Sequence, residues 1–357
     1  MSYPLLRVRL DAMESNMKMI TEKSSAYGID IWGVTKGMSA PLEIASRIER
    51  TGVSALADSR VQNIRRLKEA GIKKPFALIR IPMRSELEDV LKYVDCAVMS
   101  DLGMIKALSD LCEERKKEIG IIVMADMGDL REGFWPDEAA AVGAELKKLS
   151  GYVRVDGVGV NFGCAGGVIP TRECLEDFVR FGETLESALG GRVKVFSAGA
   201  TTRSLIAMDS GLFPERVNNL RIGEGYLLGS DKSCGVDIPW LRQDTMQLEA
   251  ELIEVRTKPS VPIGEVGFDA FGNAPVFEDR GNRKRGILAV GRQDARIEGL
   301  TPLDEGVSII TASSDHLLVD IEECPVEYKV GDILRFRPDY GAMLSLSTSP
   351  YVAKVYE

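Results

Sequence analysis

The chain has 357 residues, 45% of them hydrophobic, and its 45 basic and 54 acidic residues give a net charge of −9. This length accommodates one large domain and a smaller one with a buried core. The acidic balance argues against a nucleic-acid partner, and no apolar stretch approaches the eighteen or so residues that a membrane span needs. The expected partner is therefore a small molecule.

Cysteine and histidine usage excludes further classes of protein. The six cysteines are scattered without a CxxC pair, and the N-terminus shows no secretory signal pattern. We therefore expect reduced thiols in a cytoplasmic protein. His316 is the single histidine of the sequence, which argues against a metal site. A Ser/His/Asp triad could use only this histidine.

Eight short β-branched runs alternate with amphipathic stretches in the first two thirds of the chain. Their centres are Trp32, Ala55, Ala77, Ala97, Ile121, Val155, Val195 and Leu220. Residues 41–51, 60–70 and 172–189 place apolar positions three and four apart, which predicts helices. A doubly wound open sheet would alternate similarly, but eight units over this length favour an α/β fold of the (β/α)8 TIM-like barrel type.

After Gly229 the pattern changes to strand-like alternation between Gly, Pro and Asp turns, which predicts a C-terminal all-β domain. We place the barrel at residues 11–232 and the β domain at 233–357. The strand predicted within residues 1–10 precedes the barrel pattern and is open to pairing with the β domain.

Lys36 is the most informative residue, because it follows the first barrel strand directly. A lysine there is more often a solvated loop residue, yet barrel enzymes keep their chemistry at the carboxyl ends of strands. At that place a lysine suits an imine to pyridoxal phosphate. Other polar candidates follow later strands: Asp126, Asp129, Arg131, Asn161, Cys164, Ser197, Thr201, Thr202, Arg221 and Gly223.

The turn at residues 199–202 leads into a helical pattern, so its hydroxyls and amides suit a phosphate group. An ordinary helix N-cap is the alternative, but Gly223 and Glu224 would offer further amides beside it. Arg131 is either a surface ion pair or a clamp for a carboxylate. Cys164 is more often a small buried residue than a nucleophile, and we assign it to the wall of the site.

The β domain adds weaker candidates. Asp269 and Asp315 suit turns in which the side chain caps its own backbone. His316, before an apolar strand, is more often structural than catalytic.

Several motifs together resemble the alanine racemase-like family of pyridoxal phosphate enzymes, and within it the ornithine racemases. They are VTKG, DLREGF, NFGCAGGVIPT, PIGEVGFDAFG, SSDHLLVD and TSPYVAKVY, and the resemblance runs nearly from end to end. It implies a barrel followed by a β domain, pyridoxal 5'-phosphate as cofactor, and a homodimer with active sites at the interface.

The resemblance also implies residue roles. Lys36 would bind the cofactor as an imine and act as base on one face, and Arg221 would face the pyridine nitrogen. The phosphate would be held by Thr201, Tyr351 and the amides of Gly223 and Glu224. We add Ser197 and Thr202 to the cofactor site. Arg131 would hold the substrate carboxylate, with Asn161 and Asp315 as further substrate contacts.

The sequence departs from the family at the second acid/base, a tyrosine on the opposite face of the cofactor. The matching stretch here is 266–269, so we nominate Asp269 first and His316 second as the replacement. Met124 stands where many alanine racemases have a lysine.

The resulting prediction is a pyridoxal phosphate-dependent racemase of a basic amino acid such as ornithine or lysine. Acidic residues near the expected mouth favour a substrate with a distal ammonium group. They are Asp129, Glu132, Asp269 and Asp315. The alternatives are a non-catalytic pyridoxal phosphate-binding protein of the same superfamily, an alanine racemase, and a related aldolase or decarboxylase.

Overall fold

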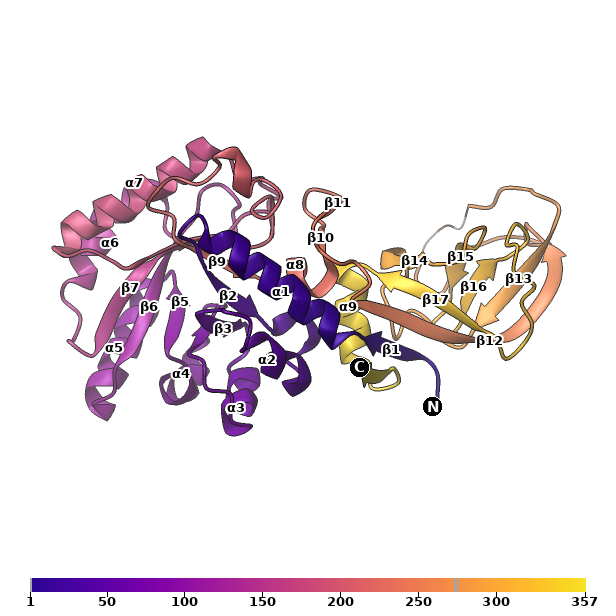
Figure 1. Cartoon of the computed structure of the whole chain (residues 1–357), viewed down its shortest axis with the longest axis horizontal. Helices are drawn as coiled ribbons and strands as arrows, with labels where there is room; N and C mark the ends of the chain where they lie inside the picture. The colour runs from indigo at the N-terminus through magenta and orange to yellow at the C-terminus, as the bar shows by residue number, and fades with distance from the viewer. Residues whose placement is uncertain (1, 273, 275) are drawn as a thin grey trace. The chain divides into compact units, whose positions relative to one another are not determined.

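The computed structural model describes residues 2–272, 274 and 276–357 (Figure 1). The chain forms two compact units. One is Leu10–Gln243, and the other joins the residues before Leu10 to Asp244–Glu357.

Residues 30–222, all of which the structure describes, contain eight parallel strands that close into a barrel. β2 pairs with β3 on one side and with β9 on the other, which closes the ring. The predicted barrel and all eight predicted strands are confirmed. The strands are β2 (Asp30–Val34), β3 (Ala55–Asp58), β4 (Phe76–Leu78), β5 (Cys96–Met99), β6 (Ile119–Ala125), β7 (Val153–Val160), β8 (Val195–Ala198) and β9 (Asn219–Ile222).

Helices connect most of these strands, and the three predicted from periodicity are α2, α3 and α7. In α7, the Thr171 side chain accepts a hydrogen bond from the Cys174 amide, and Gly190 ends the helix at φ 81°. The helices of this unit are α1 (Leu10–Ser25), α2 (Leu42–Ile48), α3 (Val61–Glu69), α4 (Leu87–Tyr93), α5 (Leu102–Arg115), α6 (Ala139–Leu146), α7 (Arg172–Leu189) and α8 (Glu224–Leu228). None of the helices that the structure describes combines the length and the hydrophobicity of a membrane-spanning segment.

The prediction of a helix after residues 199–202 is wrong. Residues 201–207 form turns, followed by a 3-10 helix at Met208–Ser210. Arg203 adopts φ 56°, which a right-handed helix cannot contain. Its amide donates to Asp231 at 2.6 Å, so a contact distant in sequence overrides the local pattern.

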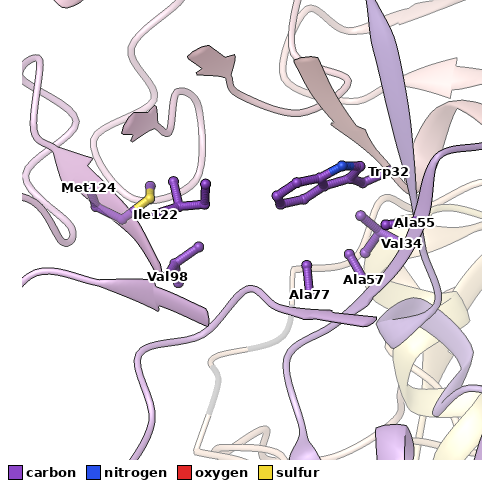
Figure 2. Close-up of a cluster of buried hydrophobic side chains, with 8 residues drawn as sticks. All are labelled: Trp32, Val34, Ala55, Ala57, Ala77, Val98, Ile122 and Met124. Carbon is purple, nitrogen blue, oxygen red and sulfur yellow. The ribbon is translucent and has the colours of Figure 1, made fainter. Parts of the chain in front are cut away.

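The barrel interior is lined by alternate strand residues that point inward (Figure 2). Trp32 extends across the interior towards Ile122, and small residues of neighbouring strands make room for the indole. The cluster consists of Trp32, Val34, Ala55, Ala57, Ala77, Val98, Ile122 and Met124. A Cβ atom on Gly159 would lie 2.8 Å from Met124 Sδ and 3.6 Å from Arg221 Nη1, so this glycine leaves space for the arginine.

The second unit is an antiparallel sheet in the order β14-β17-β12-β13-β16-β15. β1 (Leu5–Val8) pairs with β12 and β18, and Arg7 bridges these strands by donating to Glu249 at 2.8 Å and Glu357 at 2.9 Å. The unit also contains a helix, α9 (Tyr340–Thr348). Its strands are β12 (Met246–Pro259), β13 (Asn282–Leu288), β14 (Leu300–Pro302), β15 (Ser308–Ala312), β16 (Leu317–Asp320), β17 (Ile333–Pro338) and β18 (Ala353–Tyr356).

Candidate active site

The carboxyl ends of the parallel strands meet at one rim of the barrel, and the polar residues that follow them gather there. Lys36, Arg131, Arg221 and Cys164 lie near enough to one another for their charges to interact. The rim is therefore the candidate active site of this unit.

Lys36 begins a short 3-10 helix, Lys36–Met38, and one residue, Thr35, separates it from the end of β2. Its side chain is accessible to solvent, but surrounding protein groups lower the pKa of its ammonium group, mainly by desolvation. The cations Arg131 and Arg221 lower this pKa further, whereas Cys164 and Asp58 oppose them. A lowered pKa provides more of the neutral amine, which is the nucleophilic form.

Arg221 lies on β9 with 4% of its surface exposed. Among the described residues its side-chain hydrogen-bond partners are neutral: the Ser197 hydroxyl and carbonyl, the Val160 carbonyl at 2.7 Å and Asn161 Oδ1 at 2.7 Å. Burial lowers the pKa of Arg221 to about 10. A guanidinium fixed in this way, without a carboxylate partner, presents a positive charge towards the rim.

Glu132 joins two of the predicted site residues. It forms an ion pair with Arg131 through both nitrogens of the guanidinium fork, and it accepts from Asn161 Nδ2 at 2.6 Å. Burial acts to lower the pKa of Arg131, but Glu132, Cys164 and Asp129 outweigh it and the pKa is raised. Asn161 thus connects Glu132 to Arg221. Of the two interpretations of Arg131, the ion pair is the one that its contact with Glu132 matches.

Asp129 is 2% exposed and its carboxylate accepts from four backbone amides. The donors are Gly163 at 3.1 Å, Cys164 at 3.2 Å, Ala165 at 3.0 Å and Val168 at 3.2 Å. The carboxylate therefore fixes the loop after β7 to the loop after β6. The pairing of Asp129 with a substrate ammonium stays a prediction, and the contacts that the structure gives its oxygens are those to this loop.

The residues predicted for phosphate binding lie after β8 and β9. The Thr201 hydroxyl accepts from the Gly225 amide at 3.1 Å, which ties the turn after β8 to the first turn of α8. Thr202 donates to the Phe162 carbonyl at 3.3 Å and contacts the Ser233 hydroxyl at 3.1 Å. Gly223 is the N-cap of α8, and Glu224 accepts from the Lys232 amide at 2.7 Å.

Four predicted site residues lie in the other unit. Asp269 accepts from the Phe271 amide at 2.9 Å in the loop between β12 and β13. Asp315 and His316 are exposed in the turn between β15 and β16, where Asp315 accepts from Ser314 at 2.7 Å. Tyr351 follows α9 and is 65% exposed. The structure thus places the other predicted site residues together on the barrel unit and these four on the sheet unit.

Sequence reasoning missed Asp58, at the end of β3. Asp58 is fully buried and interacts electrostatically with Lys36. The available signal was an acidic residue ending an otherwise apolar strand, because a charge in that place needs buried partners.

The chain combines a closed (β/α)8 barrel, a lysine at the carboxyl ends of the barrel strands, and an antiparallel sheet unit. These features define a class of two-unit barrel enzymes with a lysine at the active-site rim. The family model "Alanine racemase, N-terminal domain" matches residues 8–230. The chain belongs to the alanine racemase family, as the motifs predicted, and it is a racemase.

Two relatives match over essentially the whole length. A lysine racemase from Thermotoga maritima is 43% identical over 100% of this chain and 99% of its own. An ornithine racemase from Acetoanaerobium sticklandii is 39% identical over 99% of each chain. Among solved structures, an alanine racemase from Streptomyces lavendulae superposes with a TM-score of 0.77 at 17% identity, covering 100% of this chain and 98% of its own. This last likeness shows the fold alone.

Proposed function

We propose that this racemase uses pyridoxal 5'-phosphate and interconverts the enantiomers of a basic amino acid, ornithine or lysine. The observation that carries the proposal is Lys36, a rim lysine with a lowered pKa in a chain similar over its full length to a lysine racemase and an ornithine racemase.

The rim fits the cofactor on three counts. Lys36 supplies an amine that can join the aldehyde carbon. Arg221, held by neutral acceptors, suits the pyridine nitrogen, to which an arginine will not surrender a proton. Thr201 and Thr202, with the amides of Gly223 and Glu224, offer hydroxyl and N–H groups for the phosphate, while the buried Ser197 hydroxyl holds Arg221. We propose that the Tyr351 hydroxyl, from the other unit, also binds the phosphate. When bound, the cofactor withdraws electrons from the substrate α-carbon and makes its proton removable.

Lys36 then serves as the base on one face. Its lowered pKa increases the share of neutral amine, the form that can accept the α-proton and then return one. We propose that Arg131 binds the substrate carboxylate through Nη1, the guanidinium nitrogen that Glu132 does not engage, with Asn161 beside it through their shared contact with Glu132. Glu132 fixes the orientation of both side chains.

The opposite face requires a second proton carrier, for which we propose Asp269 and, after it, His316. We propose that a second copy of the chain supplies it in a homodimer. The loop of residues 261–272, which carries Asp269, exposes large apolar side chains, with Ile263 91% and Phe268 77% exposed. Exposed apolar groups gathered in this way favour an interaction surface. Asp315 is proposed to pair with the distal ammonium of the substrate.

The experiment combines visible absorbance with chiral analysis. The protein is loaded with pyridoxal phosphate and incubated separately with L-ornithine, L-lysine and L-alanine, in parallel with Lys36→Ala. A bound chromophore that is lost in the variant, together with D-ornithine or D-lysine, supports the proposal. Formation of D-alanine alone would favour an alanine racemase, and a Lys36-dependent chromophore with no enantiomer formed would favour the binding-protein alternative.

A further inference from the structure

A buried carboxylate lies behind the segment that carries Lys36. Asp58 is fully buried, and a buried charge is retained only where hydrogen bonds satisfy it. Its Oδ2 accepts from the Thr35 hydroxyl at 2.7 Å, and its Oδ1 accepts from the Arg60 amide at 2.9 Å and from Asn63 Nδ2 at 3.0 Å. Asp58 therefore connects the residue before Lys36 to the start of α3.

The contacts continue from Asn63 to the other end of the segment. Arg66 donates from Nη2 to Asn63 Oδ1 at 3.2 Å and to the Ala40 carbonyl at 3.0 Å, and it also donates to the Ser39 carbonyl. The chain of hydrogen bonds from Thr35 through Asp58, Asn63 and Arg66 thus holds the backbone on both sides of Lys36.

The backbone after Lys36 needs such support. Ser39 and Ala40 have φ angles of 58° and 53°, in the left-handed region that disfavours residues with a Cβ atom. Conformations of this kind persist only where surrounding contacts over-determine them. The Ala40 amide donates to the Thr35 carbonyl at 3.2 Å, which folds the segment back on itself around Lys36.

We propose that Asp58 is a positioning residue for Lys36, acting through Thr35 on one side and through Asn63 and Arg66 on the other. Its carboxylate also favours the protonated form of Lys36, against the desolvation and the cations Arg131 and Arg221 that favour the neutral amine. Burial raises the pKa of Asp58, and the hydrogen bonds from Thr35, Arg60 and Asn63 act in the opposite direction. The inference rests on the proposed role of Lys36 as the cofactor-binding amine.

The first test uses the cofactor-free protein and measures the pH dependence of Lys36 labelling by an amine reagent, with peptide mapping by mass spectrometry. Asp58→Asn removes the negative charge, so the midpoint for Lys36 should move down by about one pH unit. Asp95→Asn is the matched control, because Asp95 also accepts a backbone amide, that of Phe76 at 2.8 Å, but precedes its strand and so lies away from the rim. This control should leave the midpoint unchanged.

The second test separates position from charge. Thr35→Val removes the hydroxyl contact but keeps the carboxylate, so capture of pyridoxal phosphate, followed by absorbance, should slow by about tenfold or more. Thr35→Ser restores the hydroxyl and should restore the rate. Melting temperatures of all variants are measured in parallel, and the Thr35 pair keeps the test decisive if Asp58→Asn fails to fold.

Two results would overturn the inference. One is a folded Asp58→Asn variant with the wild-type labelling midpoint, and the other is a Thr35→Val variant that captures the cofactor as fast as Thr35→Ser. Failure of the proposed function looks different, because the wild-type protein would then take up no cofactor while the labelling comparison remained measurable.

Discussion

The segment around Lys36 and the loop that carries Asp269 differ in how their backbones are held. The buried Asp58 at the end of β3 and the exposed Arg66 of α3 hold residues 35–40 on the two sides of the lysine. Residues 261–272 leave Ile263, Val266, Phe268 and Phe271 exposed, and Asp269 accepts from an amide two residues away. One proton carrier of the proposed reaction is therefore preorganised within its own unit, whereas the other depends on what covers its loop.

Loss of the Lys36 amine is expected to reduce activity more than loss of the Asp269 carboxylate. Lys36→Ala removes the proposed base and the cofactor amine, so the racemisation rate should fall by about a thousandfold or more. In Asp269→Ala the racemisation rate should fall by about a hundredfold, which is a smaller loss because Lys36 still exchanges the proton on its own face of the cofactor. Rates are measured by chiral chromatography, with Asp279→Ala, in the same connection between β12 and β13, as the control. If Lys36→Ala and Asp269→Ala both lost the cofactor completely, the expected difference between the two residues would be contradicted.

A smaller effect is expected where Asp129 fixes the loop after β7. Asp129→Asn removes the charge that four amides share, and the free energy of unfolding should fall by about 1–3 kcal/mol. Urea unfolding measures this loss, and hydrogen exchange at Gly163–Val168 should accelerate. Asp137, which is exposed and lies in the same connection between β6 and α6, provides the control variant Asp137→Asn. Unchanged protection of residues 163–168 would show that Asp129 does not hold the loop.

The rate at which Lys36 captures the cofactor should depend on pH. The amine reacts only when neutral, so the rate of pyridoxal phosphate capture should fall as the pH drops through the lowered pKa. Arg131→Gln removes one of the cations that lower this pKa, so the profile should move to higher pH. Stopped-flow absorbance without substrate measures the profile. A shift to lower pH would contradict the assigned sign.

The smallest effect on stability is expected in the exposed loop. Phe268→Ser exposes no new core, so the free energy of unfolding of a protomer should change by less than about 0.5 kcal/mol. If a second copy covers the loop, association should nevertheless weaken, as sedimentation velocity would show. Val330→Ser, elsewhere in the same unit and 59% exposed, is the control. Equal association of both variants with the wild type would argue against the covered loop.

The barrel could be predicted because each strand is a short apolar run at regular spacing, and α7 because its apolar face repeats at helical spacing over eighteen residues. The turn after β8 could not, since Arg203 takes its left-handed conformation where its amide meets Asp231, a distant residue. α9 was missed within a region read as strands.

The site divides in the same way. Lys36 and Arg221 were identified from their places at strand ends and from family motifs. The roles of Asp58 and Asp129 depend on amides and side chains of other segments, which the sequence does not bring together. Sequence reasoning found the charged groups of the rim, and the structure supplied the contacts that fix them.

The most direct test of the two-carrier account is the deuterium content of the α-carbon after reaction in deuterium oxide, measured by mass spectrometry on separated enantiomers of lysine or ornithine. With each enantiomer supplied separately, the account predicts deuterated mirror-image product from the wild type. In Asp269→Ala it predicts deuterium washed, with little inversion, into only the enantiomer that presents its α-proton to Lys36, and in Lys36→Ala neither product nor washed-in deuterium. Racemisation with deuterium uptake that survives in Lys36→Ala would contradict it.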